Sequence, residues 1–159
     1  MAKSPWFGEE PIGELLQASP AVGVVRGIAL RDERRAPMEL RESFDLAHSP
    51  YGFRSPKRAV TLISVEQHAA MQAVLGRDYA WELMRRNVLV SGINLLTLLH
   101  RDFRVGEVVL HGTRVCDPCR RMEDILGSGG YAAMVGLSGI CASVVDSGII
   151  RLGDELRAL

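Results

Sequence analysis

The sequence predicts a mainly β domain with a few short helices, arranged as a barrel rather than as alternating βαβ layers. Short apolar or alternating runs recur along the chain, and tight glycine-containing turns separate several of them. The helical stretches between them are few and short, which is typical of barrel-like β architectures. The 159 residues are enough for one domain with its own apolar core.

The order of the expected elements follows from these runs. In the first half, AVGVVRGIAL at 21–30 alternates like a strand, and its two glycines indicate a bulge. Further strands are expected at 37–46, 58–65 and 87–91. Helical segments are expected at 65–75, at 78–84 behind Asp78 as N-cap, and as a short turn at 95–99.

The second half repeats a local pattern. Residues 103–110 and 150–156 each contain a short apolar strand, then a glycine followed by an acid, then another strand. Gly106-Glu107 and Gly153-Asp154 suit tight turns that need a positive φ. A longer strand is expected at 108–115, a helix at 120–126 and a last apolar strand at 139–145.

Composition excludes several classes of protein. Nineteen basic residues balance nineteen acidic ones, so nothing indicates a general nucleic-acid or membrane surface. No run approaches the roughly 18 apolar residues of a membrane span, and the N-terminus lacks the apolar centre of a signal peptide. Three cysteines suit a reducing compartment, so we expect a cytoplasmic protein. Residues 1–18 are expected to form a poorly ordered arm, and residues 19–159 a single domain.

The segment 112–123, GTRVCDPCRRME, contains the side chain with the strongest expected reactivity, Cys119. Asp117 is a good N-cap and Pro118 suits the first helical position, so Cys119 is expected in the first helical turn. Free amides and the helix dipole there favour a thiolate. Three arginines close in sequence add positive charge: Arg114, Arg120 and Arg121.

Three stretches together resemble the MOSC domain, the C-terminal module of molybdenum cofactor sulfurases, also found as small stand-alone bacterial proteins and in amidoxime-reducing components. They are RAVTLISVE at 58–66, residues 85–123, and SGIIRLGDELRAL at 147–159. They contain an Arg-x-Asn strand, an F-R-x-G turn, a Pro-Cys pair and a final Gly-Asp. The resemblance covers about residues 20–159. It implies a MOSC-like β-barrel that binds the molybdenum cofactor or handles its sulfur.

The resemblance also implies a set of site residues. The cysteine of the Pro-Cys pair, Cys119, would be the molybdenum ligand or sulfur carrier, and a soft thiolate suits either role. Cys116 would be a resolving thiol, a supporting group or plain packing, and Cys141 is expected in the core. The phosphate of the pterin needs several donors. The candidates for binding the cofactor are Arg58, Arg85, Arg86, Asn87, Thr113 and Arg114.

One segment departs from the family pattern. Residues 44–48, FDLAH, lack the glycine of a family Gly-Asp-Arg or Gly-Asp-His, which predicts weaker cofactor binding at this edge. No pyridoxal-phosphate domain fits in 159 residues, so a lone domain would receive sulfur or cofactor from a sulfur donor or an electron-transfer protein.

Several functions stay open at this point. The protein is either a molybdenum-dependent oxidoreductase for N-hydroxylated substrates or a non-catalytic carrier and interaction module. A thiol redox protein using Cys116 and Cys119 is a third class, but too few residues follow Cys119 for a thioredoxin-like fold. A zinc site built from Cys116, Cys119, Cys141 and a histidine lacks a second closely spaced ligand pair.

Overall fold

The computed structural model describes residues 21–48 and 55–159, and the predicted N-terminal arm at 1–18 lies outside them. Its strands are β1 (Gly23–Leu30), β2 (Glu39–Arg41), β3 (Ser43–Asp45), β4 (Val60–Ser64), β5 (Val88–Ser91), β6 (Asp102–Val105), β7 (Val108–Val115), β8 (Ile140–Asp146), β9 (Ile149–Arg151) and β10 (Glu155–Ala158). Its α-helices are α2 (Val65–Leu75), α3 (Arg120–Leu126) and α4 (Gly130–Met134). Short 3-10 helices are η1 (Pro56–Arg58), η2 (Trp81–Met84) and η3 (Leu95–Leu98).

Seven of these strands close into a barrel, in the order β10-β6-β7-β8-β4-β5-β1, with β1 pairing back onto β10. Strand β2 extends the sheet beside β1, and β3 and β9 form a separate two-stranded ribbon. The pairs are antiparallel apart from β4 and β5, which run parallel because α2 and η2 connect them. The predicted mainly β class with few short helices is confirmed.

Local chemistry explains where several elements begin and turn. Ser64 caps α2, because its hydroxyl oxygen accepts the Gln67 N–H at 3.0 Å while the Gln67 side chain accepts the Ser64 N–H at 3.2 Å. The predicted bulge in β1 lies between Val25 and Gly27. The two predicted Gly-acid turns are also confirmed, with φ of 57° at Gly106 and 86° at Gly153.

The predicted bounds of the helices at 65–75 and 120–126 are confirmed, but other expectations were wrong. The strand expected at 37–46 is two strands, because β2 pairs with β1 whereas β3 pairs with β9. The helix expected at 78–84 begins only at Trp81, with Ala80 rather than Asp78 as its N-cap. Helix α4 was not expected, since it is only five residues long and follows a glycine-rich stretch.

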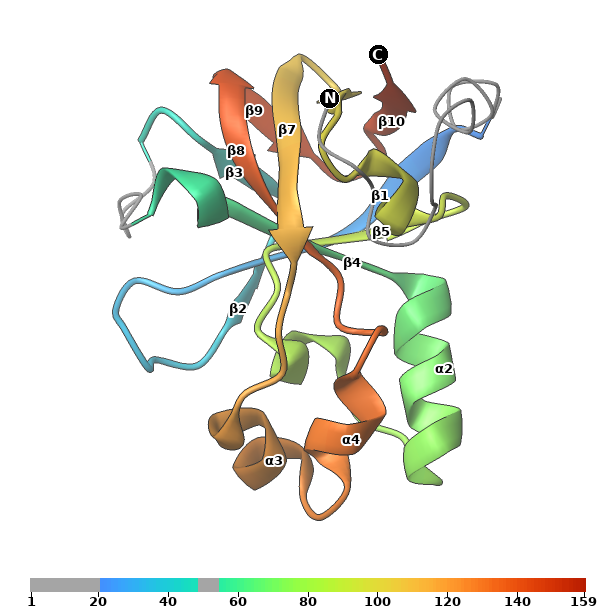
Figure 1. The fold of residues 1–159 in the computed structure, drawn as a ribbon. Helices are drawn as coiled ribbons and strands as arrows, with labels where there is room; N and C mark the ends of the chain where they lie inside the picture. The colour runs from blue at the N-terminus through green and yellow to red at the C-terminus, as the bar shows by residue number, and fades with distance from the viewer. Residues whose placement is uncertain (1–20, 49–54) are drawn as a thin grey trace.

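The apolar side chains form two cores on opposite sides of the β4–β5 pair. Leu62 and Val88 belong to the barrel interior, whereas Ile63 and Leu89 face a smaller core formed with α2, η2, α3 and α4. These two strands are therefore covered on both faces, which explains their continuous apolar sequence. The α-helices consequently gather on one side of the barrel (Figure 1).

Membrane insertion through helices finds no support in the fold. Within residues 21–48 and 55–159, none of the helices has the length and apolar character needed to cross a bilayer.

Candidate functional site

The end of β7 positions the segment that contains Cys116 and Cys119. Strand β7 pairs with β8, and their register shifts between Gly112 and Arg114, so that Thr113 is an extra residue in β7. Cys116 follows directly, and its N–H donates to the carbonyl of Gly139 at 2.9 Å. This places Cys116 diagonally across from Cys141 on the neighbouring strand.

Cys119 lies one position before the helix rather than in its first turn. It is the N-cap of α3, with extended backbone angles of φ −138° and ψ 163°, and its side chain is exposed. The expected capping by Asp117 is wrong, because its carboxylate pairs with Arg114. The carbonyl of Cys119 accepts the first helical N–H, from Met122 at 2.9 Å. The helix therefore starts at Arg120, and Pro118 lies outside it. Arg121, expected near the thiol, donates instead to the carbonyl of Arg35 at 3.2 Å.

The other two cysteines form a buried pair. The sulfur atoms of Cys116 and Cys141 lie 3.3 Å apart, and the residues are only 5% and 4% exposed. Cys141 is buried, as expected, but it does not belong to the barrel core. Its neighbours on β8, Ile140 and Ala142, point into the barrel, so Cys141 faces the opposite side of the strand.

Arginine side chains surround this thiol pair. The hydrogen bond with Cys116 lowers the pKa of Cys141 to about 7, opposed by burial and assisted by the guanidinium groups of Arg86, Arg58 and Arg114. The same hydrogen bond, with burial, raises the pKa of Cys116 well above its ordinary value. The hydrogen bond between the two sulfurs therefore favours a thiolate on Cys141, with the Cys116 thiol as its donor.

Arg86 is the buried member of this set, at 9% exposure. Its Nε donates to the carbonyl of Ser138 at 2.8 Å, and the Ser138 hydroxyl donates to the carbonyl of Cys116. Arg86 thus contacts the segment before β8, and Ser138 links that segment to Cys116 directly after β7. No sequence pattern indicates Ser138, because its role depends on this long-range contact.

The remaining candidates divide into two groups. Thr113 lies at the thiol pair, because its hydroxyl contacts the carbonyl of Lys57 and that of Cys141, the latter at 3.1 Å. Arg58 and Arg114 are exposed beside it. Arg85 diverges from Arg86, because a positive φ of 60° turns the chain between them and its guanidinium donates to the carbonyl of Ala36 at 3.0 Å.

The Asn87 side chain forms hydrogen bonds with two neighbouring strands of the sheet. Its Oδ1 accepts both the N–H and the hydroxyl of Thr61 at 3.1 Å, and its Nδ2 donates to the carbonyl of Ala29 at 3.4 Å. The side chain therefore links β4, β5 and β1.

We expect Asn87→Ala to lower the free energy of unfolding by about 2 kcal/mol, because it leaves groups of Thr61 without their partner. Asn87→Asp, which keeps the acceptor for Thr61, should lose less. Urea denaturation of the cofactor-free protein measures both. Unchanged stability combined with weaker cofactor retention would instead support the pterin contact that the sequence suggests.

A groove of about 620 Å³ lies along residues 115–118 and is lined by Cys116. It is mainly apolar and runs between the end of β7 and the loop that follows α4. Its walls are formed by Leu96, Val115, Cys116, Asp117, Pro118, Val135, Gly136 and Leu137. The groove gives solvent and small molecules access to the Cys116 side of the thiol pair.

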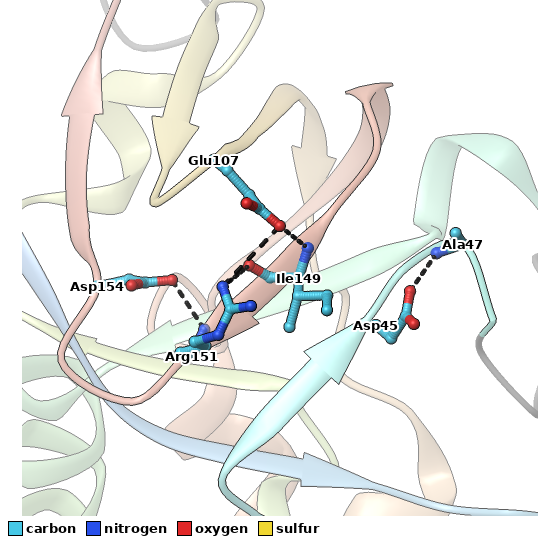
Figure 2. A network of polar contacts seen from close by, with 6 residues as sticks. All are labelled: Asp45, Ala47, Glu107, Ile149, Arg151 and Asp154. Carbon is cyan, nitrogen blue, oxygen red and sulfur yellow. Dashed lines mark hydrogen bonds and ion pairs between the residues drawn. The ribbon is translucent and has the colours of Figure 1, made fainter.

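The segment 44–48 that departs from the family pattern has a local structural role. Phe44 is buried in the barrel core, and Asp45 accepts the Ala47 N–H at 3.0 Å and pairs with His48 at 3.1 Å. The contact with His48 lowers the pKa of Asp45. Figure 2 shows Asp45 turned toward Ala47 at the β3–β9 ribbon, beside a network that includes Glu107 and Arg151. Residues 49–54, which follow this segment, lie outside the described residues.

The fold is similar to that of several solved structures. It superposes on the YUAD protein from Bacillus subtilis with a TM-score of 0.74 and 19% identity, covering 85% of this chain and 94% of that one. It superposes on YiiM from Geobacillus stearothermophilus with a TM-score of 0.74 and 14% identity, covering 86% of this chain and 75% of that one. For YiiM from Escherichia coli the TM-score is 0.60 and the identity 16%, with 89% of this chain and 70% of that one covered. These TM-scores show a shared fold.

Comparison of sequences identifies the family. No curated protein matches the chain. The model of the MOSC domain, however, matches residues 51–157, more than half of the chain. This family is related to the molybdenum cofactor sulfurases, which supports a general role connected with the molybdenum cofactor. The chain therefore belongs to the MOSC domain family.

Proposed function

We propose that this protein binds the molybdenum cofactor through the sulfur of Cys119, or carries sulfur on that thiol. The observation that carries the proposal is the exposure of Cys119, since the other two cysteines of the chain are buried against each other. A ligand can reach Cys119 without any rearrangement of the barrel. Its place before α3 and behind Pro118 also holds the thiol on a fixed element.

The neighbouring groups fit such a cofactor. Thiolate sulfur is a suitable protein ligand for molybdenum, and the guanidinium group of Arg58 is exposed for a phosphate, as is that of Arg114 once it leaves its ion pair with Asp117. The groove beside Cys116 falls in the size range of small-molecule sites. Bound molybdenum would supply two-electron redox chemistry, as required to reduce an N-hydroxylated substrate. The residues of this chain would bind and orient the cofactor and its substrate.

The competing functions make different use of the cysteines. A redox protein using Cys116 and Cys119 needs these two thiols to meet, yet Cys116 faces Cys141. A zinc site needs a cluster of ligands, and among residues 21–48 and 55–159 no three His, Cys, Asp or Glu side chains form one. A non-catalytic carrier in the cytoplasm that passes cofactor to a partner uses the same Cys119 contact, and turnover of an N-hydroxylated base distinguishes it from a reductase.

We expect Cys119→Ser to lose most of the bound molybdenum, because a hydroxyl is a much harder and weaker ligand than a thiolate. The protein should be purified from a host that makes the cofactor, and its molybdenum and pterin contents measured. Cys141→Ala is the matched control, since it also removes one thiol but leaves the exposed one.

A sulfur-carrying role has a separate measurement. Incubation with a low-molecular-weight persulfide should add the mass of one sulfur atom to the wild-type protein and to Cys141→Ala, but not to Cys119→Ser. Equal metal, pterin and sulfur loading of Cys119→Ser and wild type would overturn the proposal.

A further inference from the structure

We propose that Cys116 and Cys141 form a redox-active dithiol that a peroxide converts into a disulfide, a modification site distinct from the Cys119 thiol. The proposal starts from the placement of the two sulfurs. Cys116 lies directly after β7 and Cys141 near the start of β8, and these two strands run side by side in the barrel (Figure 1). The sulfurs are 3.3 Å apart, so closing to a disulfide length needs a movement of about 1.3 Å.

The backbone holds the two residues in this arrangement. The N–H of Cys116 donates to the Gly139 carbonyl, and its own carbonyl accepts the Ser138 hydroxyl. Cys141 is fixed within β8, where its register partner is Arg114. The thiols therefore remain neighbours, and one does not need to search for the other after oxidation.

A buried arginine supplies the charge that such a pair needs. Among the described residues, no carboxylate lies within ion-pair distance of Arg86, although this side chain is only 9% exposed. A buried cation is costly without a negative partner. The Cys141 thiolate, stabilised by the Cys116 thiol and by three arginines, provides that partner.

The chemistry is balanced with hydrogen peroxide as the oxidant. The Cys141 sulfur attacks one peroxide oxygen, the O–O bond breaks and hydroxide leaves, which gives a sulfenic acid. The Cys116 sulfur then attacks the Cys141 sulfur, and the S–O bond breaks. The hydroxyl group of the sulfenic acid leaves with the Cys116 proton as water. Overall, two thiols and one hydrogen peroxide give one disulfide and two waters. A small oxidant can approach the thiol pair through the groove that Cys116 lines, and the attacking Cys141 sulfur lies 3.3 Å from the Cys116 sulfur.

Oxidation would also alter the segment that carries Cys119, because Cys116 lies three residues before it. Drawing Cys116 toward β8 would pull on residues 117–119 at their N-terminal anchor. This consequence rests on the proposed function, whereas the disulfide itself does not. The test is therefore performed both in wild type and in Cys119→Ser.

The cofactor-free proteins should be treated with hydrogen peroxide, alkylated, digested and mapped without reduction. We expect one peptide pair that joins Cys116 to Cys141 in both proteins, and recovery of both thiols on adding dithiothreitol. In Cys116→Ser, oxidation of Cys141 should stop at a sulfenic acid that dimedone traps. In Cys141→Ser the fast oxidation should be lost.

The dependence on pH gives a second readout. The groups facing Cys141 are the Cys116 thiol, whose pKa is raised well above its ordinary value, and the guanidinium groups of Arg86, Arg58 and Arg114, so the group of this set that titrates near neutrality is the Cys141 thiol. Because its pKa is lowered to about 7, the oxidation rate should rise as pH increases through about 7 and then level off. Two thiols that stay reduced in the folded protein, or a peroxide-induced disulfide that joins Cys119 to another cysteine, would overturn the proposal.

Discussion

Replacing Gly139 by alanine should lower the free energy of unfolding by about 3 kcal/mol, through steric overlap added to an unfavourable backbone conformation. Gly139 has a φ of 87°, which L side chains rarely adopt. A Cβ at this position would overlap the carbonyl oxygen of Leu62 and lie 3.0 Å from its carbon. Both are backbone atoms of β4, so a side-chain rotation cannot relieve the clash.

The consequence extends to the thiol pair. The Gly139 carbonyl accepts the Cys116 N–H, so a displaced Gly139 also moves the residue that faces Cys141. We therefore expect Gly139→Ala to slow disulfide formation as well as to destabilise the protein.

Gly136→Ala is a matched control for this prediction. Gly136 also has a positive φ, 78°, but a Cβ there would meet no heavy atom within 4 Å. Its replacement should cost only the backbone preference, about 1 kcal/mol. Chemical denaturation of both variants separates the two contributions. Equal losses in the two would show that contact with β4 adds nothing.

Much of the fold can be predicted from the sequence because the strong local signals agree with the tertiary structure. Helix α2 begins after its N-cap Ser64 and ends before its C-cap Gly76, and a run of alternating apolar residues marks β7. The weaker strand at 37–46 had no such agreement. Its division into β2 and β3 depends on two different partner strands, which the sequence of the segment does not specify.

The site was less accessible to sequence-based prediction for the same reason. Cys116 and Cys141 are 25 residues apart, and they meet because the extra residue Thr113 shifts the register of β7 against β8. The role of Cys119 stays a prediction, and the N-cap of α3, expected at Asp117, lies two residues later at Cys119, which is a typical error at helix ends. Arg85 and Arg86 are adjacent in sequence, but the left-handed backbone of Arg85 directs their side chains to different partners.

That divergence changes the expected effect of Arg86→Ala. From the sequence, this arginine would bind cofactor phosphate and leave the stability of the cofactor-free protein nearly unchanged. In the structure it is buried and donates to the Ser138 carbonyl. We now expect its loss to lower the free energy of unfolding by about 2 kcal/mol, because that carbonyl loses its charged donor. The pKa of Cys141 should rise, since the Arg86 guanidinium lowers it.

Two comparisons separate the structural role of Arg86 from a cofactor contact. Arg86→Lys keeps the positive charge, so it should preserve more of the low-pH reactivity of Cys141 than Arg86→Ala does, measured as alkylation rate against pH. Arg85→Ala removes an arginine whose guanidinium donates to the carbonyl of Ala36, and it should leave Cys141 unaffected because the arginines that lower the pKa of Cys141 are Arg86, Arg58 and Arg114. Cofactor-free Arg86→Ala that melts at the wild-type temperature but fails to retain molybdenum would contradict this expectation. The guanidinium would then bind the cofactor, and the buried contact with Ser138 would contribute little to stability. The thermodynamic distinction is sharp because a structural contact is lost with or without cofactor, whereas a ligand contact stabilises the protein only when the ligand is bound.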